Sequence, residues 1–147
     1  MRIKNAESDD FPEALRFIRA LWDYNTYEDA PTRNVYERVL ADDASFAVFL
    51  LDDEERYVGM CHGNYFETFW MCGLTCYVSS LIVDERERGK GYGTMLLDHA
   101  VELARQRGCR AMTLDSGLPR SAAHRFYEQY GFERSCYGFE LQLPSSR

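Results

Sequence analysis

Three glycines at alternate positions link a predicted strand to an apolar helical run. The stretch reads Val83-Asp84-Glu85-Arg86-Glu87-Arg88-Gly89-Lys90-Gly91-Tyr92-Gly93-Thr94, and Met95-Leu96-Leu97 follow it. Glycines leave the backbone N–H groups of a loop uncovered, and the first N–H groups of a helix lack intrahelical partners at the positive end of its dipole. This combination favours an anion, most often a phosphate. Three basic side chains add positive charge to this stretch: Arg86, Arg88 and Lys90. The alternative interpretation of the whole stretch is an ordinary glycine-rich surface turn.

Hydrophobic periodicity places this loop inside an ordered series of helices and strands. Apolar residues at spacings of three and four predict helices over about residues 8–25, 32–41, 91–107 and 120–131. Alternating or compact apolar runs predict strands over residues 2–6, 45–51, 56–66, 74–83, 111–114 and 137–143, and residues 144–147 are expected to be a loose tail. Short connections before residue 83 indicate an antiparallel meander. A meander that continues as β-α-β-α-β belongs to the α+β class, with helices packed on a mixed sheet.

Composition and charge disfavour several classes of function. A length of 147 residues predicts one domain, and 46% hydrophobic with 28% charged residues are typical of a soluble globular protein. The net charge of −7 disfavours nonspecific nucleic-acid binding, which needs a basic surface. No run approaches the roughly 18 apolar residues of a membrane span, and the N-terminus lacks the apolar region of a signal peptide. We therefore expect a cytoplasmic protein that binds neither membranes nor nucleic acid.

The cysteines and histidines do not predict a metal site. No Cys-x-x-Cys pair is present, and the three histidines do not follow zinc-finger spacings. Cys61 and His62 are adjacent, but neighbouring residues of a strand point to opposite faces. His99 lies at the edge of an apolar helical face, which favours a structural histidine. We expect no metal and five free thiols.

Two separated motifs resemble those of one family. The segment Arg86-x-x-Gly89-x-Gly91 matches the Arg/Gln-x-x-Gly-x-Gly/Ala signature of the GCN5-related N-acetyltransferase (GNAT) superfamily. Further along the chain, Ala123-His124-Arg125-Phe126-Tyr127-Glu128-Gln129-Tyr130-Gly131-Phe132 resembles the family's Ala-x-x-Phe-Tyr-x-x-x-Gly-Phe segment. The order of elements is similar over essentially the whole chain. The resemblance implies a mostly antiparallel mixed sheet of six to seven strands flanked by four helices, in a single N-acetyltransferase domain over residues 1–147.

The resemblance also implies a reaction, in which an amine attacks acetyl-CoA directly in a ternary complex. The backbone amides of the glycine loop would hold the pyrophosphate of acetyl-CoA: Arg88, Gly89, Lys90, Gly91, Tyr92, Gly93 and Thr94. The strand that ends Leu81-Ile82-Val83 would pair with the amides of the pantetheine arm, and one of its N–H groups would stabilise an oxyanion. Tyr127 would act as the general acid toward the departing thiolate, because a phenol is protonated at pH 7. Without the resemblance, Tyr127 is better interpreted as an amphipathic core tyrosine.

Two positions depart from the family pattern. Many relatives carry a Glu or Asp on the central strand, where this chain has Tyr77-Val78-Ser79-Ser80. Glu67, near the end of the preceding strand, is a candidate general base. The alternative base is a water chain through Ser80 or Tyr77, and Glu67 would then be an ordinary solvated surface charge. Relatives often place an Asn seven residues before the tyrosine, where this chain has Arg120, which would contact a phosphate or face water.

The acceptor is less defined than the donor. Residues of the first interhelical loop would give aromatic walls and negative charge for a cationic amine, or else form an ordinary surface loop: Trp22, Tyr24, Tyr27, Glu28 and Asp29. The resemblance implies a small-molecule or peptide amine as acceptor, and a homodimer as one oligomeric state. The alternative function is a non-catalytic CoA- or dinucleotide-binding regulatory module, because strand, glycine loop, helix, strand and Asp115 share features of a Rossmann unit. The spacing Gly-x-Gly-x-Gly differs, however, from the dinucleotide fingerprint.

Overall fold

The computed structural model describes residues 1–144, and residues 145–147 of the predicted loose tail lie outside the described part. The elements in chain order are β1 (Arg2–Asn5), α1 (Phe11–Leu21), α2 (Asp29–Ala41), β2 (Ser45–Leu51), β3 (Tyr57–Thr68), β4 (Gly73–Val83), α3 (Tyr92–Gln106), β5 (Ala111–Leu114) and α4 (Ser121–Tyr130). The chain divides into two compact units, Met1–Leu114 and a second that begins at Asp115. Among the helices of residues 1–144, none is long and apolar enough to cross a membrane.

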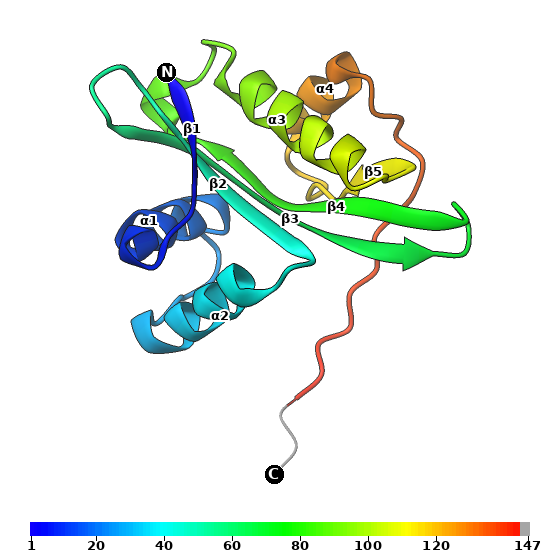
Figure 1. The fold of residues 1–147 in the computed structure, drawn as a ribbon, viewed down its shortest axis with the longest axis horizontal. Coiled ribbons are helices and arrows are strands. Elements are labelled where there is room, and N and C mark those ends of the chain that lie inside the picture. Colours follow the sequence, from blue (N-terminus) through cyan, green and yellow to red (C-terminus); the bar gives the residue numbers. More distant parts are fainter. Residues whose placement is uncertain (145–147) are drawn as a thin grey trace. The chain divides into compact units, whose positions relative to one another are not determined.

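The strands of the first unit form one mixed sheet in the order β1-β2-β3-β4-β5 (Figure 1). The first four strands pair antiparallel as a meander, and β5 pairs parallel to β4. The predicted meander and the predicted α+β class are therefore confirmed. The ladder between β3 and β4 runs from Gly59–Val83 to Thr68–Gly73, whereas β5 pairs only with Thr75–Val78 of β4.

Helices α1 and α2 cover one face of this sheet, and α3 covers the other (Figure 1). The apolar stripe of α1 is buried with α2 and the sheet in one cluster: Phe11, Ala14, Leu15, Phe17, Tyr36, Phe49, Leu51, Met60 and Ile82. On the opposite face, Leu96, Leu97 and Ala100 of α3 have no exposed surface. Each large apolar side chain buried in this way stabilises the fold by about 1.5–3 kcal/mol.

Helix α2 begins earlier than the predicted residue 32. Its first residue is Asp29, and Glu28 before it has the extended backbone of an N-cap position. Pro31 therefore falls in the first turn, where its missing N–H removes no helical hydrogen bond. The predicted bounds of the other helices agree with the structure to within about four residues, the usual uncertainty of sequence-based boundaries.

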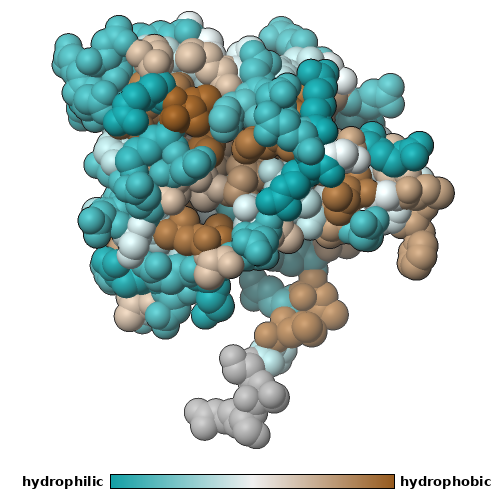
Figure 2. All heavy atoms as spheres, in the orientation of Figure 1, coloured by the Kyte–Doolittle hydropathy of each residue, from teal (hydrophilic) through white to brown (hydrophobic). Residues whose placement is uncertain are grey.

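The predicted final strand over residues 137–143 is wrong, and the described residues form five strands rather than six or seven. Alternation of apolar residues indicates strand propensity, but a strand also needs a hydrogen-bonded neighbour. Within residues 1–144 this segment pairs with no strand. Figure 2 shows the corresponding stretch as hydrophobic surface next to the grey terminal residues. Four large apolar side chains are therefore left in solvent: Tyr137, Phe139, Leu141 and Leu143.

A buried carboxylate joins the first strand, the first helix and the sheet. Asp10 lies at the start of α1 and is only 6% exposed. Its carboxylate accepts hydrogen bonds from Lys4 Nζ at 2.6 Å, the Tyr57 hydroxyl at 2.5 Å and the Glu7 backbone N–H at 2.9 Å. Burial raises the pKa of Asp10, but the hydrogen bonds from Lys4, Tyr57 and Glu7 together outweigh burial and hold that pKa below its ordinary value.

We predict that the Asp10→Asn variant loses about 1–3 kcal/mol of unfolding free energy at pH 7, the usual range for hydrogen bonds to a charged group. The folded pKa of Asp10 lies below the unfolded value, so its stabilisation is complete above the unfolded pKa and is lost as the pH falls through the folded pKa. The difference between wild type and variant should therefore shrink below about pH 4. Urea denaturation at pH 7, 5 and 3 measures it.

The exposed neighbour Asp9 offers the matched control, because Asp9→Asn makes the same chemical change on the surface. This control should change the unfolding free energy by less than about 0.5 kcal/mol at each pH. A loss in Asp10→Asn that stays constant from pH 7 to pH 3 would show that the carboxylate is not the stabilising group.

Candidate functional site

The glycine loop leaves the sheet at a fixed point. The Asp84 backbone N–H donates to the Val58 carbonyl at 2.8 Å, which continues the β3–β4 pairing by one step. The Asp84 carboxylate accepts from the Arg86 backbone N–H at 3.1 Å and from Arg16 Nη1 of α1 at 2.8 Å. These bonds hold the pKa of Asp84 below its ordinary value, the backbone N–H of Arg86 contributing most. The carboxylate thus stays charged and ties the start of the loop to α1.

The loop then turns through two left-handed glycines into α3. Gly89 has φ of +81° and Gly91, the N-cap residue of α3, has φ of +84°. A Cβ atom at either position would meet no other atom within 4 Å, so both glycines border open space. The first hydrogen bond of the helix runs from the Met95 N–H to the Gly91 carbonyl at 3.1 Å. The N–H groups of Tyr92, Gly93 and Thr94 therefore belong to the first helical turn, which has no intrahelical acceptors.

Acidic neighbours reduce the positive charge that the side chains bring to this loop. Lys90 Nζ donates to Glu87 at 2.5 Å, and this hydrogen bond raises the pKa of Lys90. Arg88 Nε points back to the Val83 carbonyl at 3.4 Å. With two of its three cationic side chains engaged in this way, the loop offers an anion its backbone N–H groups and the helix dipole.

The end of β4 has one unpaired edge in the first unit. The ladder between β4 and β5 ends at Val78–Leu114, so the last five residues of β4 have no β-sheet partner on that side among residues 1–144. Leu81 and Ile82 bury their side chains, and Val83 is half-buried. What these residues offer at the open edge is their backbone, and it can pair with the amides of an extended ligand.

A β-bulge interrupts β4 just before this edge. His62 pairs with Ser80 and Gly63 pairs with Val78, so Ser79 is the extra residue. Bulges re-aim side chains and are frequent next to active sites. Met60 and Ile82 belong to the α1–α2 cluster, and the alternation of the strands places His62 and Ser80 on that same face.

The half-buried His62 was not predicted as a site residue. Burial lowers the pKa of His62, so its imidazole is neutral at pH 7. Its neighbours on this face carry no charge: Ala47, Met60, Asn64 and Ser80. The sequence signal that could have found this place is the Ser79-Ser80 step inside an otherwise apolar strand.

Glu67 is not brought to the end of β4. It is exposed near the tip of the β3–β4 hairpin and pairs with Leu74. Leu81 pairs instead with Cys61, which precedes Glu67 by six residues on β3. At about 3.3 Å per residue, the separation along the strand is about 20 Å. A proton acceptor for chemistry beside Leu81 must lie within hydrogen-bond distance of the proton that it accepts, or one water away from that proton.

Tyr127 and Arg120 lie in the second unit, on α4. Arg120 is the N-cap residue of α4, and its N–H donates to the Gly117 carbonyl at 3.0 Å. The half-buried ring of Tyr127 lies 5.4 Å from the Phe126 ring and 5.9 Å edge-on from the Phe132 ring. The Tyr127 carbonyl accepts from the N–H groups of Gly131 and Phe132, where the helix ends. The motif therefore positions the tyrosine ring by packing on both sides.

The first interhelical loop is largely exposed, as a binding surface for an acceptor requires. Tyr24 is 82% exposed, and Glu28 and Asp29 are also exposed. Trp22 is half-buried, and Tyr27 packs against the α1–α2 core. The Tyr27 carbonyl accepts from Arg19 Nη2 at 2.8 Å, which anchors the loop to α1.

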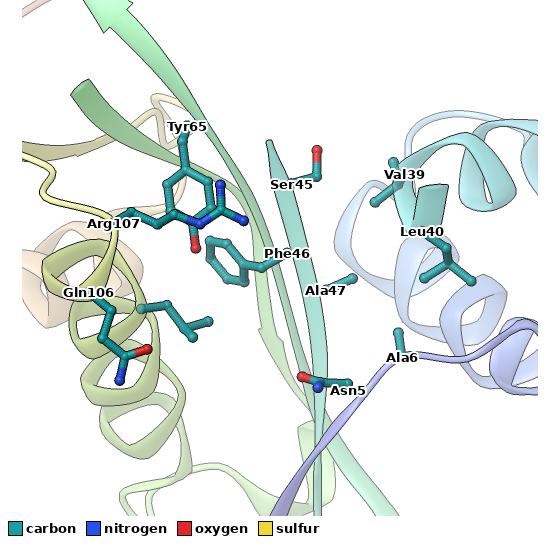
Figure 3. Close-up of a pocket in the computed structure, with 11 residues that line it drawn as sticks. Asn5, Ala6, Val39, Leu40, Ser45, Phe46, Ala47, Tyr65, Gln106 and Arg107 are labelled. Atoms are coloured by element: carbon teal, nitrogen blue, oxygen red, sulfur yellow. The ribbon is translucent and has the colours of Figure 1, made fainter. Parts of the chain in front are cut away.

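A pocket of about 280 Å³ lies in the first unit near the C-terminal end of α3 (Figure 3), and one of its lining residues, Ala47, pairs with His62. It is lined by the start of β2, the ends of β1 and α2, Tyr65 of β3 and the end of α3. The Arg107 guanidinium lies 4.6 Å from the centre of the Tyr65 ring and donates to the Asp43 carbonyl at 2.5 Å. Because α3 rises about 1.5 Å per residue, this pocket is about 20 Å from the glycine loop at the other end of the helix. It lacks the predicted site residues.

Comparisons with known proteins agree with this geometry. Residues 3–132 match the family described as Acetyltransferase (GNAT) family. The uncharacterized N-acetyltransferase YhdJ of Bacillus subtilis is 44% identical over 68 residues, which are 46% of this chain and 48% of that protein. The chain thus spans about half the length of this curated relative. The uncharacterized N-acetyltransferase MJ1207 of Methanocaldococcus jannaschii is 39% identical over 56 residues, which are 38% of this chain and 25% of that protein.

Solved structures share the fold over nearly the whole chain. A transcriptional regulator from Bacillus halodurans superposes with a TM-score of 0.86 at 24% identity, covering 97% of this chain and 99% of that one. An aminoglycoside antibiotic 6'-N-acetyltransferase from Acinetobacter haemolyticus gives a TM-score of 0.84 at 19% identity, covering 99% of this chain and 100% of that one. At such identities the likeness shows the fold alone, which is the α+β GNAT fold.

Proposed function

The chain belongs to the Acetyltransferase (GNAT) family, and on this basis we propose that it is an acetyl-CoA-dependent N-acetyltransferase of amines, acting as one domain over residues 1–147. One observation carries the proposal. The unpaired end of β4 leads directly into a loop with two left-handed glycines, which opens the first turn of α3. An extended arm that ends in a pyrophosphate requires this combination of a free strand edge and adjacent free N–H groups.

The residues of this site fit the donor. The N–H groups of residues 88–94 would bind the pyrophosphate, and the open space beside Gly89 and Gly91 allows the phosphates to approach the backbone. The backbone of Leu81, Ile82 and Val83 would pair with the amides of the arm, and an N–H of this edge would stabilise negative charge on the thioester oxygen. Arg120 would contact a phosphate, because a guanidinium binds phosphate bidentately.

We predict that Gly91→Ala raises the Kd for acetyl-CoA at least about tenfold, because a side chain in the left-handed region costs about 1–2 kcal/mol and the loop relaxes away from its binding geometry. Titration calorimetry with acetyl-CoA measures the Kd of both proteins. The same titration with NAD should show no binding to the wild type. This experiment also tests the alternative of a dinucleotide-binding module.

Gly108 provides the matched control at the other end of α3. It has φ of +80°, and a Cβ there would also meet nothing within 4 Å. Gly108→Ala should therefore cost similar stability but leave the Kd for acetyl-CoA unchanged. An equal loss of affinity in both variants would remove the loop from the binding site, and tight NAD binding without acetyl-CoA binding would overturn the proposed function.

Tyr127 is the proposed general acid for the departing thiolate. Its phenol is a donor at pH 7, and packing between Phe126 and Phe132 limits the positions that its ring can take. The proposed attack is direct, with the amine and acetyl-CoA bound together. The acceptor is a small-molecule or peptide amine, and the exposed acidic and aromatic loop between α1 and α2 favours a cationic one.

We predict that Tyr127→Phe lowers kcat at least about tenfold, since general acid catalysis usually contributes a hundredfold or more. The KM for acetyl-CoA should stay within about twofold, because the phenyl ring preserves the packing. Release of CoA thiol, followed with a panel of amines, is the measurement. An unchanged kcat would exclude Tyr127 as the acid, and no thiol release with any amine would favour a CoA-binding regulatory module without catalysis.

The proposed general base is His62, with Glu67 as the competing candidate from the sequence. His62 is neutral at pH 7 and lies beside Ser80 at the bulge, one residue from Leu81. Glu67 lies about 20 Å along the strand from the residue that pairs with Leu81. Ser80 is buried, pairs with His62 and would position a water between His62 and the amine.

We predict that His62→Gln lowers kcat/KM roughly 100-fold at pH 7, the low end for loss of a general base. Burial holds the pKa of His62 below its ordinary value, so kcat/KM of the wild type should fall as the pH drops through that lowered pKa and His62 becomes protonated. The variant should lose this acid limb. The measurement is the pH profile of kcat/KM from pH 5 to pH 9.

Two further variants complete this experiment. His99 of α3 also has its pKa lowered by burial, and His99→Gln should keep both the rate and the acid limb. Glu67→Gln should change kcat/KM by less than about threefold, in keeping with an exposed residue outside the site. Loss of the acid limb in Glu67→Gln, with His62→Gln unaffected, would assign the base to Glu67 instead.

A further inference from the structure

Arg16 of α1 reaches across to the start of the glycine loop. Its Nη1 donates to the Asp84 carboxylate at 2.8 Å, and its Nη2 donates to the Tyr57 carbonyl of β3 at 3.0 Å. Its Nε donates to Glu13, one turn earlier on α1, at 2.9 Å, and its Cζ lies 4.3 Å from the centre of the Phe17 ring. Residues of α1, β3 and the loop therefore hold this guanidinium in one place.

This contact differs from an isolated surface ion pair. Such a pair usually contributes little, because water screens it and two long side chains must be ordered. The Arg16 side chain is 45% exposed, but Glu13 and the Phe17 ring already order its guanidinium. The bond to Asp84, whose side chain is 25% exposed, therefore costs little further side-chain entropy. The guanidinium can thus fix the position of the Asp84 carboxylate.

Asp84 is the residue at which the glycine loop begins to turn. Its Oδ2 atom accepts from Arg16, and its Oδ1 atom accepts from the Arg86 backbone N–H at 3.1 Å. The Asp84 carbonyl accepts from the Glu87 N–H at 2.9 Å, which closes a short 3-10 helix over Glu85–Glu87. The carboxylate that Arg16 holds therefore also organises the first turn of the loop.

This turn leads directly to the left-handed glycines. Glu87 accepts from Lys90 Nζ at 2.5 Å, and Gly91, the next residue, is the N-cap of α3. A continuous series of contacts thus runs from the Arg16 guanidinium to the first free N–H groups of the helix. A movement of the Asp84 carboxylate would release this turn and change the direction of the N–H groups that follow.

We propose that Arg16 is a positioning residue for acetyl-CoA, which fixes Asp84 and, through Asp84, the backbone N–H groups that bind the pyrophosphate. This inference rests on the proposed acetyltransferase function. Arg16 needs no contact with acetyl-CoA for this role, because N–H groups lose affinity for a phosphate when the loop that carries them can move. Helix α1 carries none of the predicted donor residues, but it then controls the affinity for the donor.

A double-mutant cycle, measured by titration calorimetry with acetyl-CoA, tests this series of contacts. Arg16→Met keeps an apolar stem beside Phe17 and removes the guanidinium, and Asp84→Asn removes the charge that Arg16 binds. Each variant should raise the Kd for acetyl-CoA roughly tenfold, and the double variant should bind at most about threefold more weakly than either one. Independent effects would instead multiply to roughly 100-fold, and that result would overturn the proposal.

Arg33 of α2 provides the matched control. Its side chain is 46% exposed, its Nε lies 4.0 Å from Asp29 of the same helix, and its Cζ lies 4.4 Å from the centre of the Phe11 ring. Arg33→Met therefore removes a guanidinium from a similar environment on a different helix. It should cost similar stability in urea denaturation and leave the Kd for acetyl-CoA within about twofold. An equal loss of affinity in this control would reduce the effect of Arg16→Met to general stability.

Two further measurements separate positioning from binding and from catalysis. In hydrogen exchange without ligand, the amides of Arg86 and Glu87 should exchange faster in Arg16→Met than in the wild type or in Arg33→Met. In thiol release with an amine from the panel, Arg16→Met should raise the KM for acetyl-CoA roughly tenfold and keep kcat within about threefold.

The outcomes distinguish this proposal from the proposed function. A wild type that binds acetyl-CoA, together with an unchanged Kd in Arg16→Met, would overturn the role of Arg16 alone, even if the loop amides exchange faster. A wild type that does not bind acetyl-CoA would overturn the proposed function and this role with it.

Discussion

The central constraint of this structure is the unequal pairing of β4. On one side β4 is bound along its length to β3, and on the other side it is bound to β5 only from Thr75 to Val78. The long antiparallel ladder makes the strand rigid enough to remain extended where the second neighbour ends. An open edge in the middle of a sheet would otherwise be closed by another strand. The site follows from this difference in length.

Close packing of α3 on the sheet keeps the glycine loop next to that edge. A Cβ atom on Gly59 would lie 2.9 Å from Leu96 Cδ1 and 3.2 Å from the Ile82 carbonyl oxygen, so glycine lets Leu96 of α3 pack directly against the β3 backbone. Gly59 pairs with Val83, the last residue of β4 before the loop. The helix start and the strand end are thus held together by the same contact, and Asp84 adds the link to α1.

The sequence predicted the glycine loop and its flanking elements better than it predicted which side chains lie together across the sheet, for a physical reason. The glycine loop, α3 and the strands that flank it are local features, in which spacing determines geometry. The bulge at Ser79, the place of His62 beside Ser80, and the distance of Glu67 from Leu81 all depend on the register between β3 and β4. A change of one residue in register reverses which face a side chain occupies, and the bulge at Ser79 shifts the register within one strand pair. The same holds for Asp10, which looks like its exposed neighbour Asp9 in the sequence but accepts three hydrogen bonds in the fold.

The prediction of a final strand was wrong for a related reason, since residues 137–143 have the alternation of a strand but no paired neighbour in the described chain.

The charge distribution explains why the loop needs its glycines. The chain carries a net charge of −7, and the loop itself contains Glu85 and Glu87 beside its basic residues. Lys90 is engaged by Glu87, and Arg88 turns toward the Val83 carbonyl, so these two side chains offer less positive charge to an anion. The backbone N–H groups, whose positions are fixed by the helix and the two left-handed glycines, would then contribute much of the selectivity for the proposed pyrophosphate. Affinity of this origin depends less on ionic strength than affinity from exposed side-chain charges, because the N–H dipoles are held at short range. The net charge of −7 would favour a cationic amine as the other substrate, because a negatively charged protein attracts cations at long range.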